Sequence, residues 1–287
     1  MDNAYRQRLR TFSELNFARS DTKVERRPAE FDARNGVSTL RSARWFALLL
    51  LASLPARAQS IPGAVLAKHE PHHHLAYEDS ELRVLRVHVP PHDTTLLHEH
   101  DPDYFWIALG ASEVVNARLG APEARIRSSD LSIHYTAGKF AHVARNPGDS
   151  PFDNITVELL PQQANVRNLC ESAVADRPHD CPQAMAEPTR RFRGASEHAA
   201  FTTDQLRVSL VTIQPGMAMQ PSAEVKRAWV IALDTADAGR TLRIEGSGRW
   251  VGGTFRPAPG AEWKVRNGGT TAVRVLTVVP LPPPAGR

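Results

Sequence analysis

The sequence predicts an all-β protein made of two β-barrel or sandwich units in tandem. From Glu81 onward, apolar and polar residues alternate with a period of two in short runs separated by turns. The same pattern returns after an interruption rich in Pro, Asp and Gln. The 17 Gly and 22 Pro allow many turns, and convincing amphipathic helices are few, with single turns at 182–187 and 234–238.

The alternating runs give the expected strands of each unit. In the first unit they cover 82–89, 104–109, 124–127, 131–135 and 155–160. In the second unit they cover 206–213, 229–233, 241–244 and 273–279. Each unit then spans about a hundred residues, a common size for a small barrel or sandwich.

These runs divide the chain into five segments. They are a leader, a first barrel, a linker that carries both cysteines, a second barrel and a flexible tail, at 1–58, 59–165, 166–200, 201–280 and 281–287.

The charge balance excludes two kinds of partner. The net charge of +4 comes from the leader, where residues 1–58 hold 11 Lys or Arg against 6 Asp or Glu, while the rest of the chain is close to neutral. A nucleic-acid or membrane-surface protein would carry its basic residues on the folded part. No run of 18 apolar residues occurs, so we expect no membrane span.

The leader has the pattern of a secretory signal peptide. Basic Arg41 and Arg44 precede a short apolar run, and Ala56 and Ala58 form an Ala-x-Ala cleavage site before Gln59. The alternative, a buried N-terminal helix, fits the flanking charges less well. We therefore expect an exported protein, periplasmic or secreted, and interpret residues 1–40 as a misassigned translation start.

The only two cysteines, Cys170 and Cys181, lie in the linker. In an oxidising compartment their spacing predicts a disulfide that closes a small loop. Two free thiols are the alternative, and a metal site is less well supported because no Cys-x-x-Cys pair occurs.

Histidines cluster in the first unit, where ten of the twelve fall between His69 and His142. On an extended chain, His98 and His100 share one face, so both imidazoles can meet one ion inside a barrel. His142, after a later turn, offers a third imidazole. Fe, Mn, Ni, Cu and Zn all accept imidazole ligands, and three neutral histidines leave room for an acid ligand and for substrate.

Other histidines of the unit have less regular surroundings. The run 72–74 lies in a Pro-containing lead-in without strand register, so we expect a solvated surface segment with adventitious metal affinity. His88 shares parity with Arg86 and is expected to face solvent. His134 is a strand residue whose face the sequence does not determine.

The spacing of these residues resembles the two motifs of the cupin superfamily. His92 stands at the first glycine of motif one, His98 and His100 form its histidine pair, and Gly110 is near its last glycine. Motif two is matched by Gly138, His142 and Asn146, with one residue too many between the first two.

The resemblance implies double-stranded β-helix barrels, with His98, His100 and His142 on one divalent transition metal. The glutamate of motif one is absent. A shifted Asp103 takes its place, or the acid ligand is missing; Tyr104 occupies the expected position.

Strand parity places Tyr104 on the inward face with His98 and His100, as a hydrogen-bonding neighbour of the metal more than as a ligand. A bulge at Pro102 would turn Asp103 inward instead. We favour Asp103 as a turn residue.

The second unit resembles a degenerate copy of the first, as in a two-barrel cupin. Aligning Pro215-Gly216 with Pro91-His92 places Ser222 and Glu224 at the histidine pair, and Trp263 takes the place of His142. Trp263 and Trp229 are expected to fill the space of the metal. An unrelated sandwich domain is the alternative.

Two functions from different classes follow for a barrel with one metal per chain. The first is an exported metal-dependent enzyme, an oxygenase or isomerase acting on a small organic molecule, in which Tyr104 or Asp103 relays a proton. The second is a non-catalytic periplasmic protein that binds a small molecule or a metal. The oligomeric state is open, a homo-oligomer included.

Overall fold

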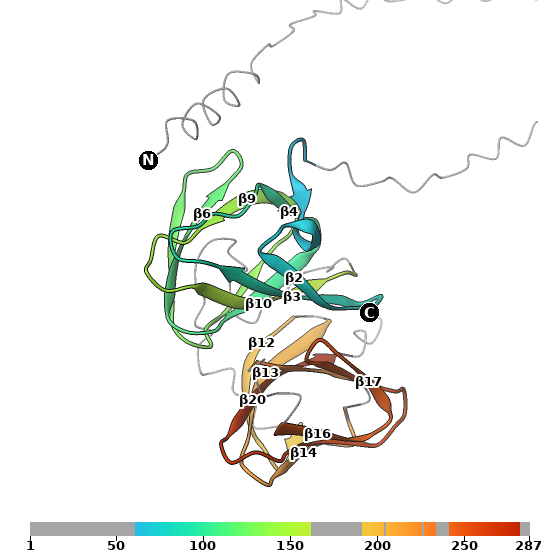
Figure 1. The fold of residues 1–287 in the computed structure, drawn as a ribbon. Helices are drawn as coiled ribbons and strands as arrows, with labels where there is room; N and C mark the ends of the chain where they lie inside the picture. The colour runs from blue at the N-terminus through green and yellow to red at the C-terminus, as the bar shows by residue number, and fades with distance from the viewer. Residues whose placement is uncertain (1–60, 162–190, 204, 226, 234–240, 282–287) are drawn as a thin grey trace, which may run out of the picture. The chain divides into compact units, whose positions relative to one another are not determined.

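The computed structural model describes residues 61–161, 191–203, 205–225, 227–233 and 241–281, and all of these described residues belong to one compact unit. Its first barrel packs two five-stranded sheets. One has the order β1-β4-β9-β6-β7 and the other β2-β3-β10-β5-β8 (Figure 1). The strands are β1 (Val65–Leu66), β2 (His73–Glu78), β3 (Leu82–Val89), β4 (His98–His100), β5 (Asp103–Ala108), β6 (Ser112–Arg118), β7 (Ala124–Ser128), β8 (Ile133–Thr136), β9 (Phe140–Arg145) and β10 (Phe152–Leu159), with a 3-10 helix at Ala67–His69.

The second barrel repeats this arrangement except at one strand, because β17 pairs with β18 whereas β7 pairs with β6. Its sheets have the orders β11-β14-β19-β16 and β12-β13-β20-β15-β18-β17. The strands are β11 (Phe192–Arg193), β12 (Ser196–Thr202), β13 (Leu206–Ile213), β14 (Ala218–Pro221), β15 (Trp229–Ala232), β16 (Leu242–Gly246), β17 (Gly248–Val251), β18 (Thr254–Pro257), β19 (Trp263–Asn267) and β20 (Val273–Pro280). The two barrels thus share a jelly-roll strand order, and the predicted fold class is confirmed.

The clearest period-two runs gave the most exact predictions. Strands β3 and β13 have the predicted bounds, and β9 is the later strand expected to carry His142, whereas β2 and β6 were not predicted. Strand β11 and the first part of β12 lie in the range expected for the linker, 166–200. The expected helical turns at 182–187 and 234–238 lie outside the described residues. Within the described part of the chain, no helix is long and apolar enough to cross a membrane.

A buried asparagine fixes the same turn in both barrels. Asn146 donates from Nδ2 to the carbonyl oxygens of Val89 (3.0 Å) and Ser150 (2.8 Å), and its Oδ1 accepts the N–H of Gly148. Asn267 makes the matching bonds to Ile213 (2.9 Å), Thr271 (2.7 Å) and Gly269. The side chain replaces water for backbone groups at the end of a strand, which is why an amide is required there.

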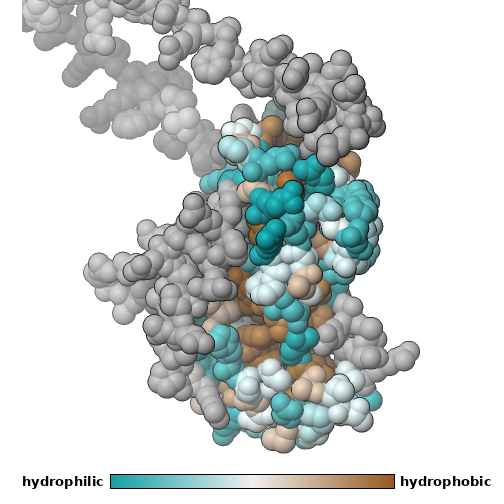
Figure 2. Space-filling model, turned by 90° about the vertical axis from the view of Figure 1, so that its left-hand side faces the viewer, coloured by the Kyte–Doolittle hydropathy of each residue, from teal (hydrophilic) through white to brown (hydrophobic). Residues whose placement is uncertain are grey.

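Within the compact unit, both barrels contribute to one apolar core. It joins Val84, Phe105 and Val157 of the first barrel with Phe201 and Leu276 of the second, among others. The rings of Phe105 and Phe201 are 5.3 Å apart in an edge-to-face arrangement. Figure 2 shows hydrophobic residues also reaching the surface on one face, between hydrophilic ones.

The two tryptophans expected to fill the second barrel have different positions. Trp263 is buried in the core of that barrel, together with Phe192, Met219 and Phe255. Trp229 belongs to the core shared with the first barrel, and its Nε1 donates to Asp79 (2.9 Å). The expectation for Trp229 was therefore wrong, because its strand turns that side chain toward the other barrel.

We expect Asn146→Ala and Asn267→Ala to lower the free energy of unfolding by about 1–3 kcal/mol each, because each leaves buried backbone groups unpaired. Urea denaturation measures the change. The exposed Arg243 provides the control, and Arg243→Ala should change stability far less. An asparagine variant as stable as this control would contradict the structural role.

Candidate metal centre

Two antiparallel strands place three predicted ligands together. His98 and His100 lie on β4, and His142 lies on β9 directly opposite His98 in the register. All three side chains are buried. The centroids of the His98 and His142 rings are 4.3 Å apart, and those of His98 and His100 are 5.2 Å apart.

A fourth imidazole comes from the lead-in, where the expectation of a solvated segment was wrong for His73. His73 begins β2, is 7% exposed, and its ring centroid lies 4.6 Å from that of His98. Strand β2 pairs with β3 and has an irregularity between Leu75 and Tyr77. This irregularity breaks the alternation of buried residues, so the sequence showed no strand period there.

Each of the four imidazoles donates from Nδ1 to a fixed acceptor. The acceptor of His73 is Glu70 Oε2 (2.6 Å), and that of His98 is the carbonyl oxygen of Leu96 (2.9 Å). The remaining two bonds run from His100 to Glu158 Oε1 (2.9 Å) and from His142 to Asn116 Oδ1 (2.7 Å). Carboxylate and carbonyl acceptors of this kind orient metal-ligating histidines in proteins and leave Nε2 as the ligand atom.

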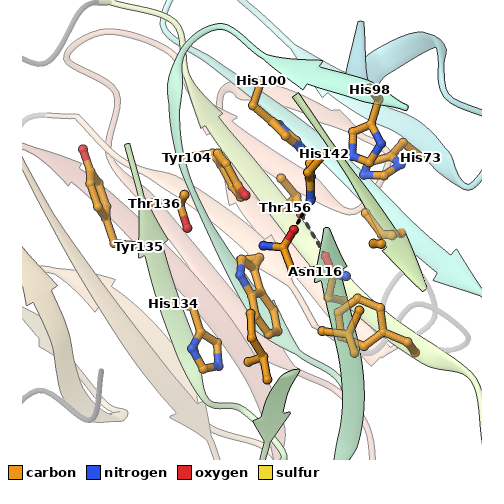
Figure 3. A pocket seen from close by; sticks show the side chains of 17 residues that line it. His73, His98, His100, Tyr104, Asn116, His134, Tyr135, Thr136, His142 and Thr156 are labelled. Carbon is orange, nitrogen blue, oxygen red and sulfur yellow. Dashed lines mark hydrogen bonds between the residues drawn. The ribbon is translucent and has the colours of Figure 1, made fainter. Parts of the chain in front are cut away.

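The geometry fits a metal ion. One nitrogen of each of His73, His98 and His100 lies within 4.8 Å of the others, so these three can hold an ion. The Nε2 atoms of His98 and His142 are buried without a hydrogen-bond partner, an arrangement that is costly unless a ligand engages them. Figure 3 shows the four rings gathered at one end of the pocket.

Burial favours the neutral form of three imidazoles of the cluster, those of His73, His98 and His142. Loss of solvation, together with the neighbouring imidazoles, holds the pKa of both His98 and His142 well below the usual value and also lowers the pKa of His73. Neutral imidazole is the form that binds metals. Burial alone would raise the pKa of Glu70, but hydrogen bonds from His73 and His72 lower it to about 2.

The cluster borders a cavity of about 60 Å³, roughly the space of four to six water molecules. Its other walls are apolar or uncharged, with Trp106, Val114, Ile126, Phe152, Asn154 and Thr156 among them. The described lining contains no Lys, Arg, Asp or Glu. His134, whose face the sequence left open, is buried in this lining and stacks on Trp106 with ring centroids 4.0 Å apart.

Tyr104 and Asp103 point to different places. Tyr104 is buried, lines the cavity and stacks on His100 with ring centroids 4.1 Å apart. Asp103 accepts hydrogen bonds from Tyr135 Oη (2.6 Å) and from the N–H of Gly138 (2.8 Å). Both carboxylate oxygens of Asp103 therefore hold the turn before β9.

The left-handed turn residues lie at the expected glycine position of the first motif and one residue after it in the second. His92 has a φ of 60°, the left-handed conformation that favours the glycine of motif one. Lys139, with a φ of 65°, has the left-handed position before His142, in place of the predicted Gly138. Gly138 is required for a different reason, since a Cβ there would lie 2.4 Å from backbone atoms of Asp101 and Pro102.

Sequence reasoning missed His73, Glu70 and Glu158. The available signal for Glu158 was a charged residue at an inward position of a strongly apolar strand. In the second barrel, Ser222 and Glu224 lie beyond the end of β14, so neither occupies a strand position equivalent to the histidine pair. Cys170, Cys181 and the leader through Gln59 lie outside the described residues.

No family model and no curated protein matches the sequence. Among solved structures, AerE from Microcystis aeruginosa is similar at 12% identity, covering 74% of this chain and 94% of that one, with a TM-score of 0.51. The salicylate 1,2-dioxygenase of Pseudaminobacter salicylatoxidans (12% identity, 71% and 75% covered, TM-score 0.48) is also similar. So is the oxalate decarboxylase of Lactobacillus farciminis (11%, 70% and 77%, 0.46).

At these identities the likeness concerns the fold alone. The strand order defines a protein of two jelly-roll barrels in tandem, and the buried imidazoles give the first barrel a candidate metal centre.

The metal-free protein should lose stability as the pH falls. The lowered pKa values of His98 and His142 mean that the unfolded chain, with histidine pKa values near about 6.5, binds more protons than the folded chain below that pH. The free energy of unfolding should therefore decrease from about pH 6.5 downward. Urea denaturation between pH 5 and 8 checks this, and a flat profile would contradict it.

The bonds of Asp103 predict a structural defect in Asp103→Ala. The Tyr135 hydroxyl and the Gly138 N–H lose their acceptor, so stability should fall by about 1–3 kcal/mol, while the metal content of purified protein stays the same. Calorimetry and elemental analysis measure the two quantities. Metal loss without a stability change would make Asp103 a ligand.

Proposed function

We propose that the protein is an exported metal-dependent enzyme, an oxygenase or isomerase that acts on a small organic molecule. The observation that carries this proposal is the set of buried imidazoles beside a cavity, each with Nδ1 held by an acceptor. Imidazole ligands suit Fe, Mn, Ni, Cu and Zn. His98, His100 and His142 are the ligands that we assign, with one divalent metal per chain.

When bound, the ion supplies a Lewis acid or a redox centre. The surrounding residues orient the substrate and exclude water. Tyr104, stacked on His100 at the cavity wall, is placed to hold or pass a proton near the ligands. Asp103 is less suited to this role because both its oxygens accept hydrogen bonds in the turn.

The cavity favours a particular kind of substrate. Its described lining has no charged side chain apart from ionisable imidazoles and tyrosines, so nothing there neutralises a second anionic group far from the ion. A small molecule that is neutral, or that places its single negative charge on the metal, fits this environment. Apolar walls such as Val114, Ile126 and Phe152 would contact an uncharged body.

We further propose that the second barrel is a duplicated copy that has lost its metal site. The shared strand order and the matching hydrogen bonds of Asn146 and Asn267 support a duplication. Trp263 and the apolar residues packed around it leave this barrel with a filled interior. Its role is then structural.

The alternative is a periplasmic protein that binds a small molecule or a metal without turnover. The absence of Asp and Glu from the described cavity lining favours it, because many metal enzymes use a carboxylate as general base.

Elemental analysis and a screen of small carboxylic acids and enols, followed both by dioxygen consumption and by product analysis for isomerisation, test the proposal. We expect one metal per chain, a large loss of metal in His98→Ala and His142→Ala, and turnover with at least one compound. His88→Ala, on the exposed face of β3, is the control and should retain the metal. Metal binding with no turnover would favour the binding protein. The absence of stoichiometric metal would exclude the metal-dependent enzyme and a metal-binding protein, and would leave only a protein that binds a small molecule.

A further inference from the structure

We propose that His73 is a fourth metal ligand and that Glu70 is the residue that positions it, so that the lead-in segment 61–78 completes the metal site. This inference rests on the proposed metal-binding function and deepens it. It concerns residues outside both sequence motifs.

His73 lies beside two of the predicted ligands, His98 and His100. Its ring lies on the same side of the barrel as the predicted ligands, and one of its nitrogens is within 4.8 Å of a nitrogen of both His98 and His100. With Nδ1 bound to Glu70, Nε2 is the nitrogen left for an ion. His74, the next residue, points the other way and is exposed, as expected for an extended strand.

Glu70 is a buried carboxylate that is fixed by hydrogen bonds. Its side chain is fully buried, and no Lys or Arg among the described residues is paired with it. Four donors converge on the carboxylate instead: the N–H groups of His72 (2.8 Å) and Leu96 (3.1 Å), and Nδ1 of His72 (3.0 Å) and His73 (2.6 Å). A buried carboxylate held this firmly fixes both the tautomer and the ring direction of His73.

A second imidazole of the cluster, His100, is also hydrogen-bonded to a buried carboxylate. Glu158 is buried and binds Nδ1 of His100 (2.9 Å), while its other oxygen accepts from Arg83. Two carboxylate–imidazole pairs therefore belong to one cluster, and the ring centroids of His73 and His100 are 6.0 Å apart. Metal-binding histidines are commonly supported by such pairs, whereas a histidine that only fills a core needs no such carboxylate.

The proposal also accounts for the acid that is missing from the first motif. Neither Asp103 nor Tyr104 supplies a carboxylate to the cluster. In our assignment an imidazole takes the vacant ligand position, and the carboxylate stands one hydrogen bond further from the ion. The ligand set is then four neutral imidazoles, with the negative charges of Glu70 and Glu158 outside it.

Titration of the full-length metal-free protein with Co²⁺, followed by visible absorption, tests this assignment. We expect His73→Ala to weaken Co²⁺ binding at least tenfold and to change the d–d spectrum, because one nitrogen ligand is lost. Glu70→Gln should weaken binding roughly 10–100-fold and shift the spectrum while keeping four nitrogen ligands.

Two matched controls separate positioning from general damage. Glu99→Gln changes another buried carboxylate, which lies between His98 and His100 but accepts from the N–H of Ile61 (2.8 Å). His74→Ala changes the exposed neighbour of His73. Both controls should keep the wild-type spectrum and affinity. A Glu70→Gln spectrum identical to the wild type, or an unchanged His73→Ala, would overturn the proposal.

A measurement on the wild-type protein covers the case in which a variant fails to fold. Co²⁺ should slow amide hydrogen exchange in residues 70–78, because the ion ties β2 to β4 and β9. Co²⁺ binding without slower exchange there would overturn the role of His73 and leave the metal site of His98, His100 and His142 intact. Failure of the wild type to bind Co²⁺ at all would overturn the proposed function together with this inference.

Discussion

The hydrogen bond from each imidazole Nδ1 to its acceptor is the interaction on which the candidate site depends. Without it, the four imidazole rings, packed within a few ångströms of each other, could rotate or change tautomer, and their Nε2 atoms would no longer converge. The acceptors come from the turn at Glu70, the backbone at Leu96, Asn116 on β6 and Glu158 on β10. The site is therefore distributed over both sheets of the first barrel.

Strands β5 and β10 contribute both to the site and to the core shared with the second barrel. On β5, Tyr104 and Trp106 line the cavity, whereas Phe105 and Ile107 belong to the shared core. Strand β10 divides its residues in the same way, because successive side chains of a strand point to opposite faces. Neither face of β5 or β10 is left to water, so these two strands are more apolar than the strands of a half-exposed sheet.

The sequence predicted best those strands whose residues alternate regularly. Strong period-two runs such as 206–213 gave exact strands, and the paired spacing of His98 and His100 gave two of the clustered imidazoles. The lead-in could not be predicted, because the irregularity after Leu75 disrupts its alternation and Pro71 suggests a loop.

The hydrogen-bond acceptors of the imidazoles could not be predicted from the sequence either. Glu70 is three residues from His73 and is close in sequence, but Glu158 is 58 residues from His100, and only the pairing of β5 with β10 brings that strand to the site. The positions with positive φ show the same limit. His92 and Lys139 hold backbone conformations that glycine would adopt more easily, so a motif written in glycines matches this chain loosely.

The shared core has a consequence for how the candidate metal centre is maintained. Two separate chains that met through such an apolar face would dissociate on dilution, and the sheet behind the imidazoles would then be exposed. Here Phe201 and Leu276 belong to the same polypeptide as Phe105 and Val157. The covalent link keeps the local concentration of the supporting barrel high at any protein concentration. The second barrel therefore covers the sheet behind the imidazoles at any protein concentration.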